Sequence, residues 1–416
     1  MAALCTDCFD DEHFKMLVAG MRSRRCSECE QDSSPAITAE DLAEIIAPML
    51  QERLTYGRTI RKFASADDDR GQEEPQGEEL DYFLRDILGD QNGFLPDLLE
   101  ALFESEPYDH SDPDGGFFDG DRLYEWRTVR PLDLLGQWDT ASQQIQNRHR
   151  YFSPAAIELF DGLFGGFDDL CVYRDGEQPI ISTLPEGTKV YRARDCSDQS
   201  LIEAVLREPM GQVGPSPAGV AGPGRMNADG VSVLYAAQDL ETAVSEIRPA
   251  IGSTSAVIQL MTTRPLKVLD FHLLEEAFQG ISFFNSDYDR LLERLVFIRR
   301  LHDLISRPVH PKHAHEYMIT QAMAEYLAYI HSENVDGILF KSVQREGGVN
   351  VVLFPKPHGE TLDDYGQFDI PIEYVIDSLE FRKAKKVQYF LETCFTKICI
   401  RNVTRDAQKT LGLQGA

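Results

Sequence analysis

Two CxxC pairs near the start of the chain constrain its fold more than any other feature. They are separated by seventeen residues and consist of Cys5, Cys8, Cys26 and Cys29. Four thiolates at these separations can close a tetrahedral zinc site, and such an ion folds a segment that is too short to have a core of its own. Because four cysteines leave no coordination position for a substrate, we expect residues 1–32 to be a structural zinc-binding module, with a short helix over 11–22.

The other cysteines do not extend this pattern. The chain contains eight cysteines, and the remaining four are scattered at Cys171, Cys196, Cys394 and Cys399. This distribution favours a reduced compartment and a metal site over the disulfide framework of a small secreted protein. The alternative is that the four N-terminal thiols carry no metal.

The net charge of the chain limits its partners. Its 416 residues include 69 acidic and 41 basic side chains, which gives −28 at neutral pH. Such a charge repels nucleic acids and anionic membranes, so nucleic-acid binding through the basic run at 22–25 is the weaker hypothesis. No apolar run approaches the roughly 18 residues that span a bilayer, and the N-terminus lacks the apolar region of a signal peptide. We therefore expect a cytoplasmic protein that does not bind membranes.

The chain is long enough for two or three domains, and its sequence pattern changes near residue 179. Before that point, residues 33–149 are expected to form a mostly helical region with acidic loops. Apolar residues at helical spacing predict the helices, and a run of acidic, Gly and Gln residues predicts a solvated loop. The expected helices cover 37–54, 82–88 and 95–103, and the loop covers 66–81.

From residue 179 onward, short alternating segments predict strands that are mixed with helices. The strand-like segments are 187–194, 231–237, 255–261, 266–271, 336–342 and 349–354. Because strands and helices do not alternate regularly, the pattern predicts an α+β fold and not a doubly wound sheet. We expect the longest helix at 313–333 and a final helix at 383–400.

The segment 231–249 joins a strand to a helix that begins at a capping residue. Asp239 can cap this short helix, which Pro249 ends, so Tyr235 and Glu246 are carried by two rigid elements. A flat aromatic ring and a carboxylate in such positions suit a substrate that contains a sugar and a base. The alternative is an ordinary strand–turn–helix unit with no function.

Three arginines could gather positive charge for an anion. Arg192 and Arg194 share one face near the end of a predicted strand, and a guanidinium offers a rigid fork of donors to phosphate. Arg225 lies in a glycine-rich turn whose backbone N–H groups can approach an anion. The alternative is that the first two are surface arginines and that the glycines only form a loop.

Ser342 follows a strand that reads as buried. Its hydroxyl could bond to a phosphate or ribose oxygen, although a serine at a strand end is commonly structural. No histidine lies beside it in the sequence to indicate a nucleophilic triad.

Taken in order, these segments resemble the RES-domain family, which is named for an arginine, a glutamate and a serine. The residues that carry the resemblance are Arg192 in VYRAR, Arg225 in GRMN, Tyr235 in VLYAA, Glu246 in ETAVSEIRP and Ser342 in DGILFKS, with GGVNVVLF behind them. The resemblance extends over about residues 150–357, so we expect a RES catalytic domain at 150–375, followed by a C-terminal helix and tail at 376–416. The cysteine segment resembles those that precede RES and HEPN domains.

The resemblance implies a fold like that of ADP-ribosyltransferase toxins and an enzyme that degrades NAD⁺. Members of the family release nicotinamide, some by phosphorolysis to ADP-ribose-1″-phosphate, which makes orthophosphate a co-substrate. The implied catalytic residues are Arg192, Tyr235, Glu246 and Ser342, and the implied substrate-binding residues are Arg194, Arg225, Asn227 and Asn350. Many members are toxins held by an antitoxin, so a protein regulator or antitoxin and a second copy of the chain are further candidate partners.

The chemistry of these residue types agrees with such an activity. Glu246 could stabilise an oxocarbenium-like ribose, Tyr235 could stack on nicotinamide, and Arg192 could bind a phosphate together with Ser342. NAD⁺ would be a substrate, since the dinucleotide fingerprint GxGxxG is absent. Two alternatives stay open: transfer of ADP-ribose to a protein by the same site, and an adaptor that carries a degenerate RES domain.

Overall fold

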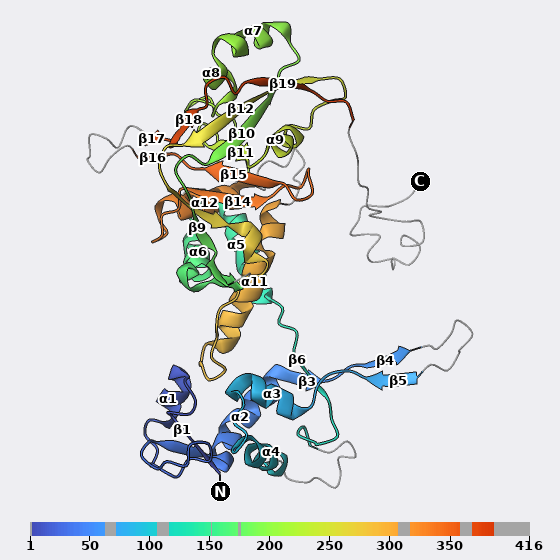
Figure 1. The fold of residues 1–416 in the computed structure, drawn as a ribbon, viewed down its shortest axis with the longest axis vertical. Coiled ribbons are helices and arrows are strands. Elements are labelled where there is room, and N and C mark those ends of the chain that lie inside the picture. The colour runs from blue at the N-terminus through green and yellow to red at the C-terminus, as the bar shows by residue number, and fades with distance from the viewer. Residues whose placement is uncertain are drawn as a thin grey trace. The chain divides into compact units, whose positions relative to one another are not determined.

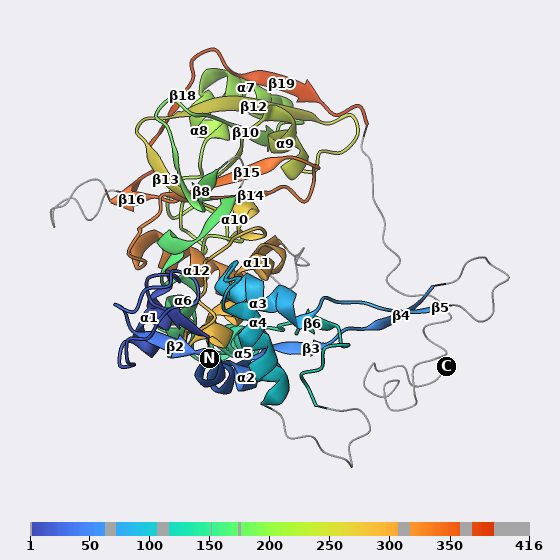
Figure 2. The ribbon, with the colours of Figure 1, turned by 60° about the horizontal axis from the view of Figure 1, so that its bottom comes forward.

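The computed structural model describes residues 2–62, 72–105, 116–150, 152–173, 176–306, 317–357 and 368–386. The chain forms two compact units, shown as ribbons in Figures 1 and 2. Unit 1 comprises Met1–Ile181, Phe271–Tyr326 and His331–Glu333, and unit 2 comprises Ser182–Asp270, Leu327–Ile330 and Asn334–Ala416. Helices and strands are mixed in an irregular order, so the predicted α+β class is confirmed.

The first helices of unit 1 begin where the sequence predicts. Their bounds are α1 Glu12–Val18, α2 Ala39–Arg53, α3 Leu80–Leu88 and α4 Leu95–Glu104. The side chain of Asp11 caps α1, because Oδ1 accepts a hydrogen bond from the Phe14 N–H at 2.8 Å, and Thr38 caps α2 in the same way. The apolar face of α2 is buried, so this helix is amphipathic as expected.

A second group of helices completes unit 1. The bounds are α5 Leu132–Asn147, α6 Pro154–Phe164, η1 Phe167–Asp169, α10 Phe271–Leu274 and α11 Tyr288–Ser306. Helix α12 runs over Met318–Tyr329, and its residues from Leu327 onward belong to unit 2. The prediction that 313–333 holds the longest helix is wrong for the described residues, because α11 has 19 residues and α12 has 12. No helix among the described residues is both long enough and apolar enough to cross a membrane.

Short two-stranded sheets join the helices of unit 1. Their strands are β1 Ala3–Cys5 with β2 Ala36–Thr38, β3 Leu54–Tyr56 with β6 Tyr124–Trp126, β4 Thr59–Lys62 with β5 Gln72–Pro75, and β7 Cys171–Tyr173 with β8 Glu177–Pro179. The ribbon of β4 and β5, visible in Figure 2, corrects the predicted loop at 66–81. Part of that loop, 66–71, lies outside the described residues, but Gln72–Pro75 pairs as a strand.

Unit 2 is built on one nine-stranded sheet with the order β18-β12-β10-β11-β15-β14-β13-β9, and β19 also pairs with β12. The strands are β9 Ile181–Leu184, β10 Lys189–Asp195, β11 Leu234–Ala237, β12 Thr254–Thr262, β13 Leu266–Asp270, β14 Gly337–Lys341, β15 Val349–Leu353, β18 Ile372–Tyr374 and β19 Glu380–Lys383. All six predicted strand segments therefore contain a strand. Two further strands, β16 Lys356–Pro357 and β17 Phe368–Asp369, follow β15 in the chain and pair with each other outside this sheet.

Three helices pack on the sheet of unit 2. Helices α7 (Gln199–Arg207) and α8 (Pro209–Val213) contact each other, and α8 contacts β10 and β12. Helix α9 (Leu240–Glu246) packs against β10, β11 and β12. Figure 1 shows α9 beside the middle of the sheet. The predicted helix at 383–400 lies almost wholly outside the described residues, since residues from 387 onward are not described.

Strands β10 and β11 separate soon after they meet, and this gap positions the site. Strand β10 pairs along its whole length with β12, and β11 pairs along its whole length with β15. Between β10 and β11, however, Tyr191 and Ala237 form the single registered pair within the described sheet. The edges of β10 and β11 beyond that pair therefore need other hydrogen-bond partners.

Candidate active site

Glu246 is the last residue of α9, and the helix is fixed at its other end by Asp239. Asp239 Oδ1 accepts a hydrogen bond from the Thr242 N–H at 2.9 Å, and Oδ2 accepts one from Thr242 Oγ1 at 2.7 Å. The predicted cap is therefore confirmed. The helix ends at Glu246, before Pro249, and Arg248 has a left-handed φ of 47°.

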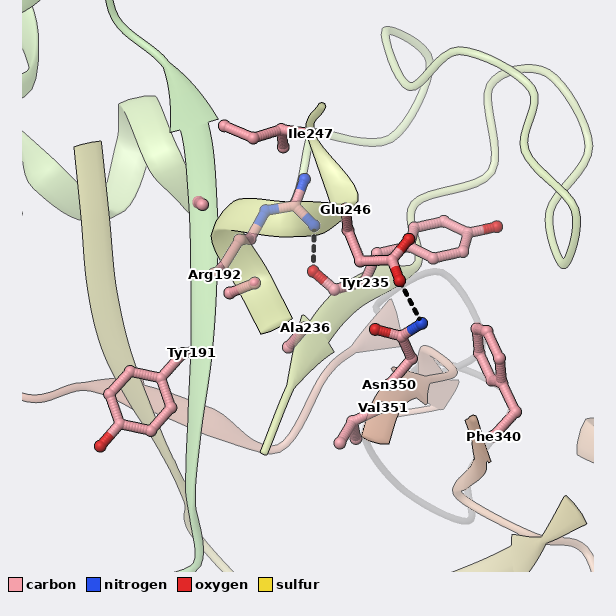
Figure 3. A pocket seen from close by; sticks show the side chains of 11 residues that line it. Tyr191, Arg192, Tyr235, Ala236, Glu246, Ile247, Phe340, Asn350 and Val351 are labelled. Carbon is pink, nitrogen blue, oxygen red and sulfur yellow. Dashed lines mark hydrogen bonds between the residues drawn. The ribbon is translucent and has the colours of Figure 1, made fainter. Parts of the chain in front are cut away.

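The carboxylate of Glu246 is held by two donors from other elements. Its Oε1 accepts hydrogen bonds from Ser342 Oγ at 2.6 Å and from Asn350 Nδ2 at 2.8 Å, the latter drawn in Figure 3. In the described part of the chain, Oε2 has no hydrogen-bond partner. One oxygen therefore fixes the carboxylate, and the other is available to a ligand.

Ser342 is itself fixed by a tight loop between β14 and β15. Its N–H donates to the Gly348 carbonyl at 2.8 Å, and its Oγ accepts from the N–H groups of Gln344 and Arg345, both at 3.1 Å. The hydroxyl donates its one hydrogen bond to Glu246 and accepts two, so all its hydrogen-bonding positions are occupied. Ser342 therefore acts in this structure as a support for Glu246.

Arg345 was not predicted as a site residue, yet it ties this loop to α9. Its NH1 donates to Asp239 Oδ1 at 2.7 Å and to Thr242 Oγ1 at 2.9 Å. A single arginine in a polar loop carries no sequence signal for such a contact. Only the negative charge of the Asp239 carboxylate could have suggested that a cation would be attracted there.

Arg192 fills the gap between β10 and β11. Its Nε donates to the Val213 carbonyl at 2.8 Å, and its NH1 donates to the Tyr235 carbonyl at 2.6 Å, a bond also drawn in Figure 3. Burial lowers the pKa of the Arg192 guanidinium to about 10, so the group is charged at neutral pH. No carboxylate among the described residues forms an ion pair with it, and a half-buried cation that lines a cavity attracts an anionic ligand.

Arg194 has a different environment although it shares a face of β10 with Arg192. Its NH1 donates to the backbone carbonyl and to the side-chain Oε1 of Gln212, and the side chain is exposed. Both arginines thus reach the end of α8, as the alternation along a strand requires. Arg194 does not contribute to the lining of the cavity described below.

The hydroxyl of Tyr235 stabilises the glycine-rich turn that precedes β11. It donates to Asn227 Oδ1 at 2.8 Å and accepts from the Met226 N–H at 2.9 Å. The Asn227 amide in turn donates to the carbonyls of Gly222, Ala228 and Val231. Asn227 therefore holds the turn together. Arg225 lies in the same turn, is half-buried and does not line the cavity described below.

Residues of β10 and β11 line one side of a cavity of about 310 Å³. Figure 3 shows the side chains around it. The lining residues are Tyr191, Arg192, Ala193, Tyr235, Ala236, Ala243, Glu246, Ile247, Phe340, Asn350 and Val351. Of the predicted site residues, the cavity brings together four (Arg192, Tyr235, Glu246 and Asn350), and Ser342 is joined to it through Glu246.

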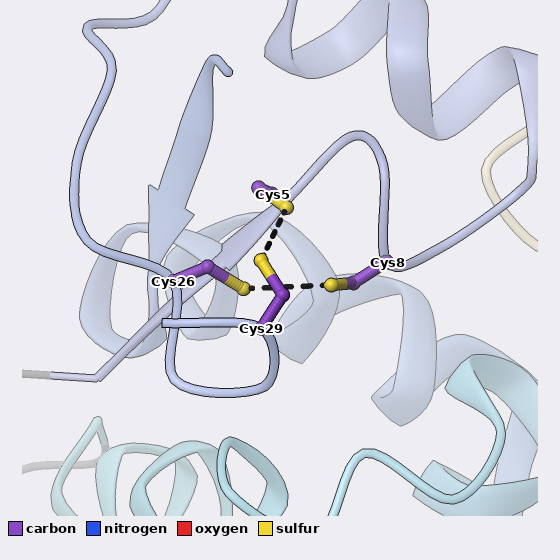
Figure 4. Close-up of side chains that lie close together, drawn as sticks. All are labelled: Cys5, Cys8, Cys26 and Cys29. Atoms are coloured by element: carbon purple, nitrogen blue, oxygen red, sulfur yellow. Dashed lines mark hydrogen bonds between the residues drawn. The ribbon is translucent and has the colours of Figure 1, made fainter. Parts of the chain in front are cut away.

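The four N-terminal cysteines converge in unit 1, as Figure 4 shows. Their sulfurs lie within 4.8 Å of one another, with Cys5 to Cys29 at 3.7 Å and Cys8 to Cys26 at 3.8 Å. The edge of a tetrahedron with Zn–S bonds of about 2.3 Å is about 3.8 Å long, so the donors fit a zinc ion.

The backbone around Cys26 favours a thiolate. Burial alone would raise the pKa of the Cys26 thiol, but the N–H groups of Cys29 and Glu28 point at its sulfur and lower the pKa to about 7. One of these contacts, from the Glu28 N–H, measures 3.4 Å. A group that is easily deprotonated suits a metal ligand.

One protein family matches part of the chain. The model of the RES domain family matches residues 189–375, which include β10, α9, β14 and β15. No curated protein and no solved structure matches the chain. The resemblance inferred from the sequence is therefore confirmed for this part of the chain: residues 189–375 form a RES domain, and a cluster of four cysteines precedes it.

Proposed function

We propose that this RES domain cleaves the N-glycosidic bond between nicotinamide and ribose in NAD⁺. The observation that carries the proposal is the cavity that holds both Arg192, a half-buried cation without an ion-pair partner among the described residues, and Glu246, a carboxylate fixed through one oxygen. NAD⁺ combines a phosphate with a ribosyl carbon that becomes positive as the bond breaks. The RES family match is consistent with NAD-related chemistry.

Glu246 would act on the ribose. Loss of nicotinamide leaves an oxocarbenium-like sugar that carries positive charge. A carboxylate that is already held in place stabilises this charge well, because it does not have to reorient during the reaction. The hydrogen bonds from Ser342 and Asn350 supply that fixation on Oε1. The other oxygen, Oε2, would face the sugar.

Arg192 would bind a phosphate, either of the NAD⁺ pyrophosphate or of an attacking orthophosphate. An anion would balance the charge of the half-buried guanidinium, whose hydrogen-bond partners among the described residues are backbone carbonyls. The cavity of about 310 Å³ is near the lower limit of small-molecule sites. It would therefore hold the nicotinamide–ribose half of the dinucleotide, with the adenosine half outside.

We favour phosphorolysis as the complete reaction. The bond between ribose C1 and the pyridinium nitrogen breaks, and its electron pair leaves with neutral nicotinamide. An orthophosphate oxygen then bonds to the same carbon, which gives ADP-ribose-1″-phosphate. Depletion of NAD⁺ by this reaction would suit a toxin or a defence effector.

The cysteine cluster would hold a structural zinc ion. Four sulfur donors fill the coordination sphere, so the ion would supply folding energy to a short segment and take no part in the cleavage.

The test is NAD⁺ consumption by the purified full-length chain, with and without orthophosphate. The variants are Glu246→Gln, which keeps the shape but removes the charge, and the matched control Glu373→Gln, an exposed residue on β18 outside the cavity. We expect phosphate-dependent loss of NAD⁺ in the wild type and the control, and at least about a 100-fold slower loss in Glu246→Gln. Intact NAD⁺ in the wild type, or equal rates in both variants, would overturn the proposal, and loss without phosphate would exclude phosphorolysis in favour of hydrolysis.

A further inference from the structure

The amide of Asn350 leaves one of its atoms without a partner. The Asn350 side chain lines the cavity and is 5% exposed. Its Nδ2 donates to Glu246 Oε1 at 2.8 Å, while Oδ1 is buried and has no hydrogen-bond partner among the described residues. Buried acceptors are almost always matched in folded proteins, so an unmatched one on a residue that lines a cavity points to a ligand.

The orientation of this amide follows from chemistry. An ionised carboxylate can only accept hydrogen bonds, so the group that faces Glu246 must be the NH₂ of Asn350. The carbonyl oxygen must then point away from Glu246. A flip of the amide would place two acceptors against each other, and the unmatched oxygen is therefore a property of the site.

The two residues paired with Asn350 in the sheet offer its side-chain oxygen no donor. Asn350 lies in β15 and is paired in register with Phe340 on β14 and with Ala237 on β11. Neither neighbouring side chain can donate a hydrogen bond. By contrast, the buried Asn227 uses its amide for three backbone carbonyls and its Oδ1 for the Tyr235 hydroxyl.

We propose that Asn350 Oδ1 accepts a hydrogen bond from a hydroxyl of the nicotinamide ribose, and that this contact makes the site selective for ribosyl over deoxyribosyl substrates. The inference rests on the proposed function. Because Asn350 is bonded directly to Glu246, a sugar that faces the carboxylate also lies next to the amide oxygen. A site built around a hydroxyl rejects the analogue that lacks it, since its own acceptor is left unpaired.

The test compares three NAD⁺ analogues with NAD⁺ itself on the full-length chain. Two analogues lack the 2′- or the 3′-hydroxyl of the nicotinamide ribose, and the third carries acetylpyridine, which lacks the N–H donors of the carboxamide. The variant Asn350→Leu removes the acceptor with little change in size. The control Ser342→Ala removes the other donor to Glu246 and leaves Asn350 intact.

The measured quantity is the ratio of kcat/KM for NAD⁺ to that for each analogue. Removal of a hydroxyl also changes the intrinsic lability of the glycosidic bond, so each ratio is compared with that of the wild type. We expect the ratio for one deoxy analogue to fall by about 10-fold or more in Asn350→Leu. It should stay unchanged in Ser342→Ala, although that variant is slower on every substrate.

Two results would overturn the inference. Asn350→Leu could lower activity on all substrates with unchanged ratios, which is the behaviour of a residue that only positions Glu246. Alternatively, the ratio could change for the acetylpyridine analogue alone, which would assign the acceptor to the carboxamide. Failure of the proposed function is a different observation, namely that the wild type consumes none of the four compounds, and the inference would fall with it.

Discussion

The guanidinium of Arg345 lies 2.7 Å from the carboxylate of Asp239, and this ion pair joins the loop that carries Ser342 to the start of the helix that carries Glu246. The two partners are 106 residues apart in the sequence. The same loop meets the end of the helix through the bond from Ser342 to Glu246. Helix and loop are thus clamped at both ends of α9.

Loss of the Arg345 clamp should impair turnover more than folding. Arg345→Ala frees the loop, and we expect NAD⁺ cleavage to fall by about 10-fold through kcat, because a displaced Ser342 no longer orients the carboxylate. Both ion-pair partners are partly exposed, so the free energy of unfolding should change by less than about 1 kcal/mol. Steady-state kinetics and urea unfolding measure the two effects. A matched control is Arg382→Ala, which breaks the exposed pair with Glu380 on β19, and equal losses in the two variants would contradict the clamp.

Gly348 should tolerate no side chain while Thr242 is present. A Cβ atom at this position would lie 2.5 Å from Thr242 Oγ1. We expect Gly348→Ala to lower the free energy of unfolding by about 1–3 kcal/mol. The double variant with Thr242→Ala should recover part of that loss, so the two changes should be non-additive in a denaturation cycle. If the losses in the free energy of unfolding are additive, a contact other than the one with Thr242 causes the destabilisation by Gly348→Ala.

Tyr235→Phe should destabilise unit 2. The change leaves Asn227 Oδ1 and the Met226 N–H without their partner, and both residues are buried. A buried polar group without a hydrogen bond costs about 1–3 kcal/mol. Chemical denaturation should show this loss, whereas Tyr374→Phe on β18 should stay within about 0.5 kcal/mol of the wild type. A stable Tyr235→Phe protein with impaired turnover would instead favour a direct role of the hydroxyl in the reaction.

Removal of the metal should unfold the cysteine segment. We expect one zinc ion per chain by elemental analysis, and its loss in Cys26→Ser or after treatment with a strong chelator. Hydrogen exchange over residues 2–32 should then become fast. Cys196→Ser, which changes a buried cysteine of unit 2, should keep the zinc content of the wild type. A metal-free wild type with protected amides in this segment would contradict a structural ion.

Lys356 should make stability depend on pH above neutrality. Burial lowers the pKa of its ammonium group to about 8, although Nζ donates to the carbonyl of Ala328 and to Asn334. The unfolded chain holds this proton up to about pH 10.4, so between about pH 8 and 10.4 the unfolded state binds more protons and stability rises with pH. Urea unfolding at several pH values should show a smaller rise in Lys356→Met than in the wild type. Parallel curves would mean that the pKa of Lys356 is not lowered.

Local rules predict much of this fold. The caps at Asp11 and Asp239 and the strands around the site follow from patterns within a few residues. These rules do not predict helix α11, because charged residues interrupt its apolar stripe. Arg294 is 6% exposed and donates from Nε to the Leu163 carbonyl at 3.0 Å, a partner 131 residues away. Nothing in the sequence marks this arginine as an inward-facing residue.

The sequence predicts which residues belong to the candidate site, but it does not predict which of them contact one another. Arg192, Glu246 and Ser342 stand out in the sequence, yet the bond between the last two spans 96 residues. The role of Arg345 also depends on a fold that brings its loop to the helix cap. The unmatched oxygen of Asn350 becomes visible once the register of β11, β14 and β15 is known.

The partners of Arg192 have a consequence for genetics. Its guanidinium is held by main-chain carbonyls of Val213 and Tyr235, and it closes the gap where β10 and β11 part. Substitutions at Val213 keep the carbonyl, so any effect they have on the arginine comes through the side chain, which is 1% exposed and packs in the core of unit 2. If the proposed function holds, a genetic screen for alleles that leave NAD⁺ intact should therefore return codon 192 with a folded protein, whereas alleles at codon 213 should be those that lower the stability of unit 2.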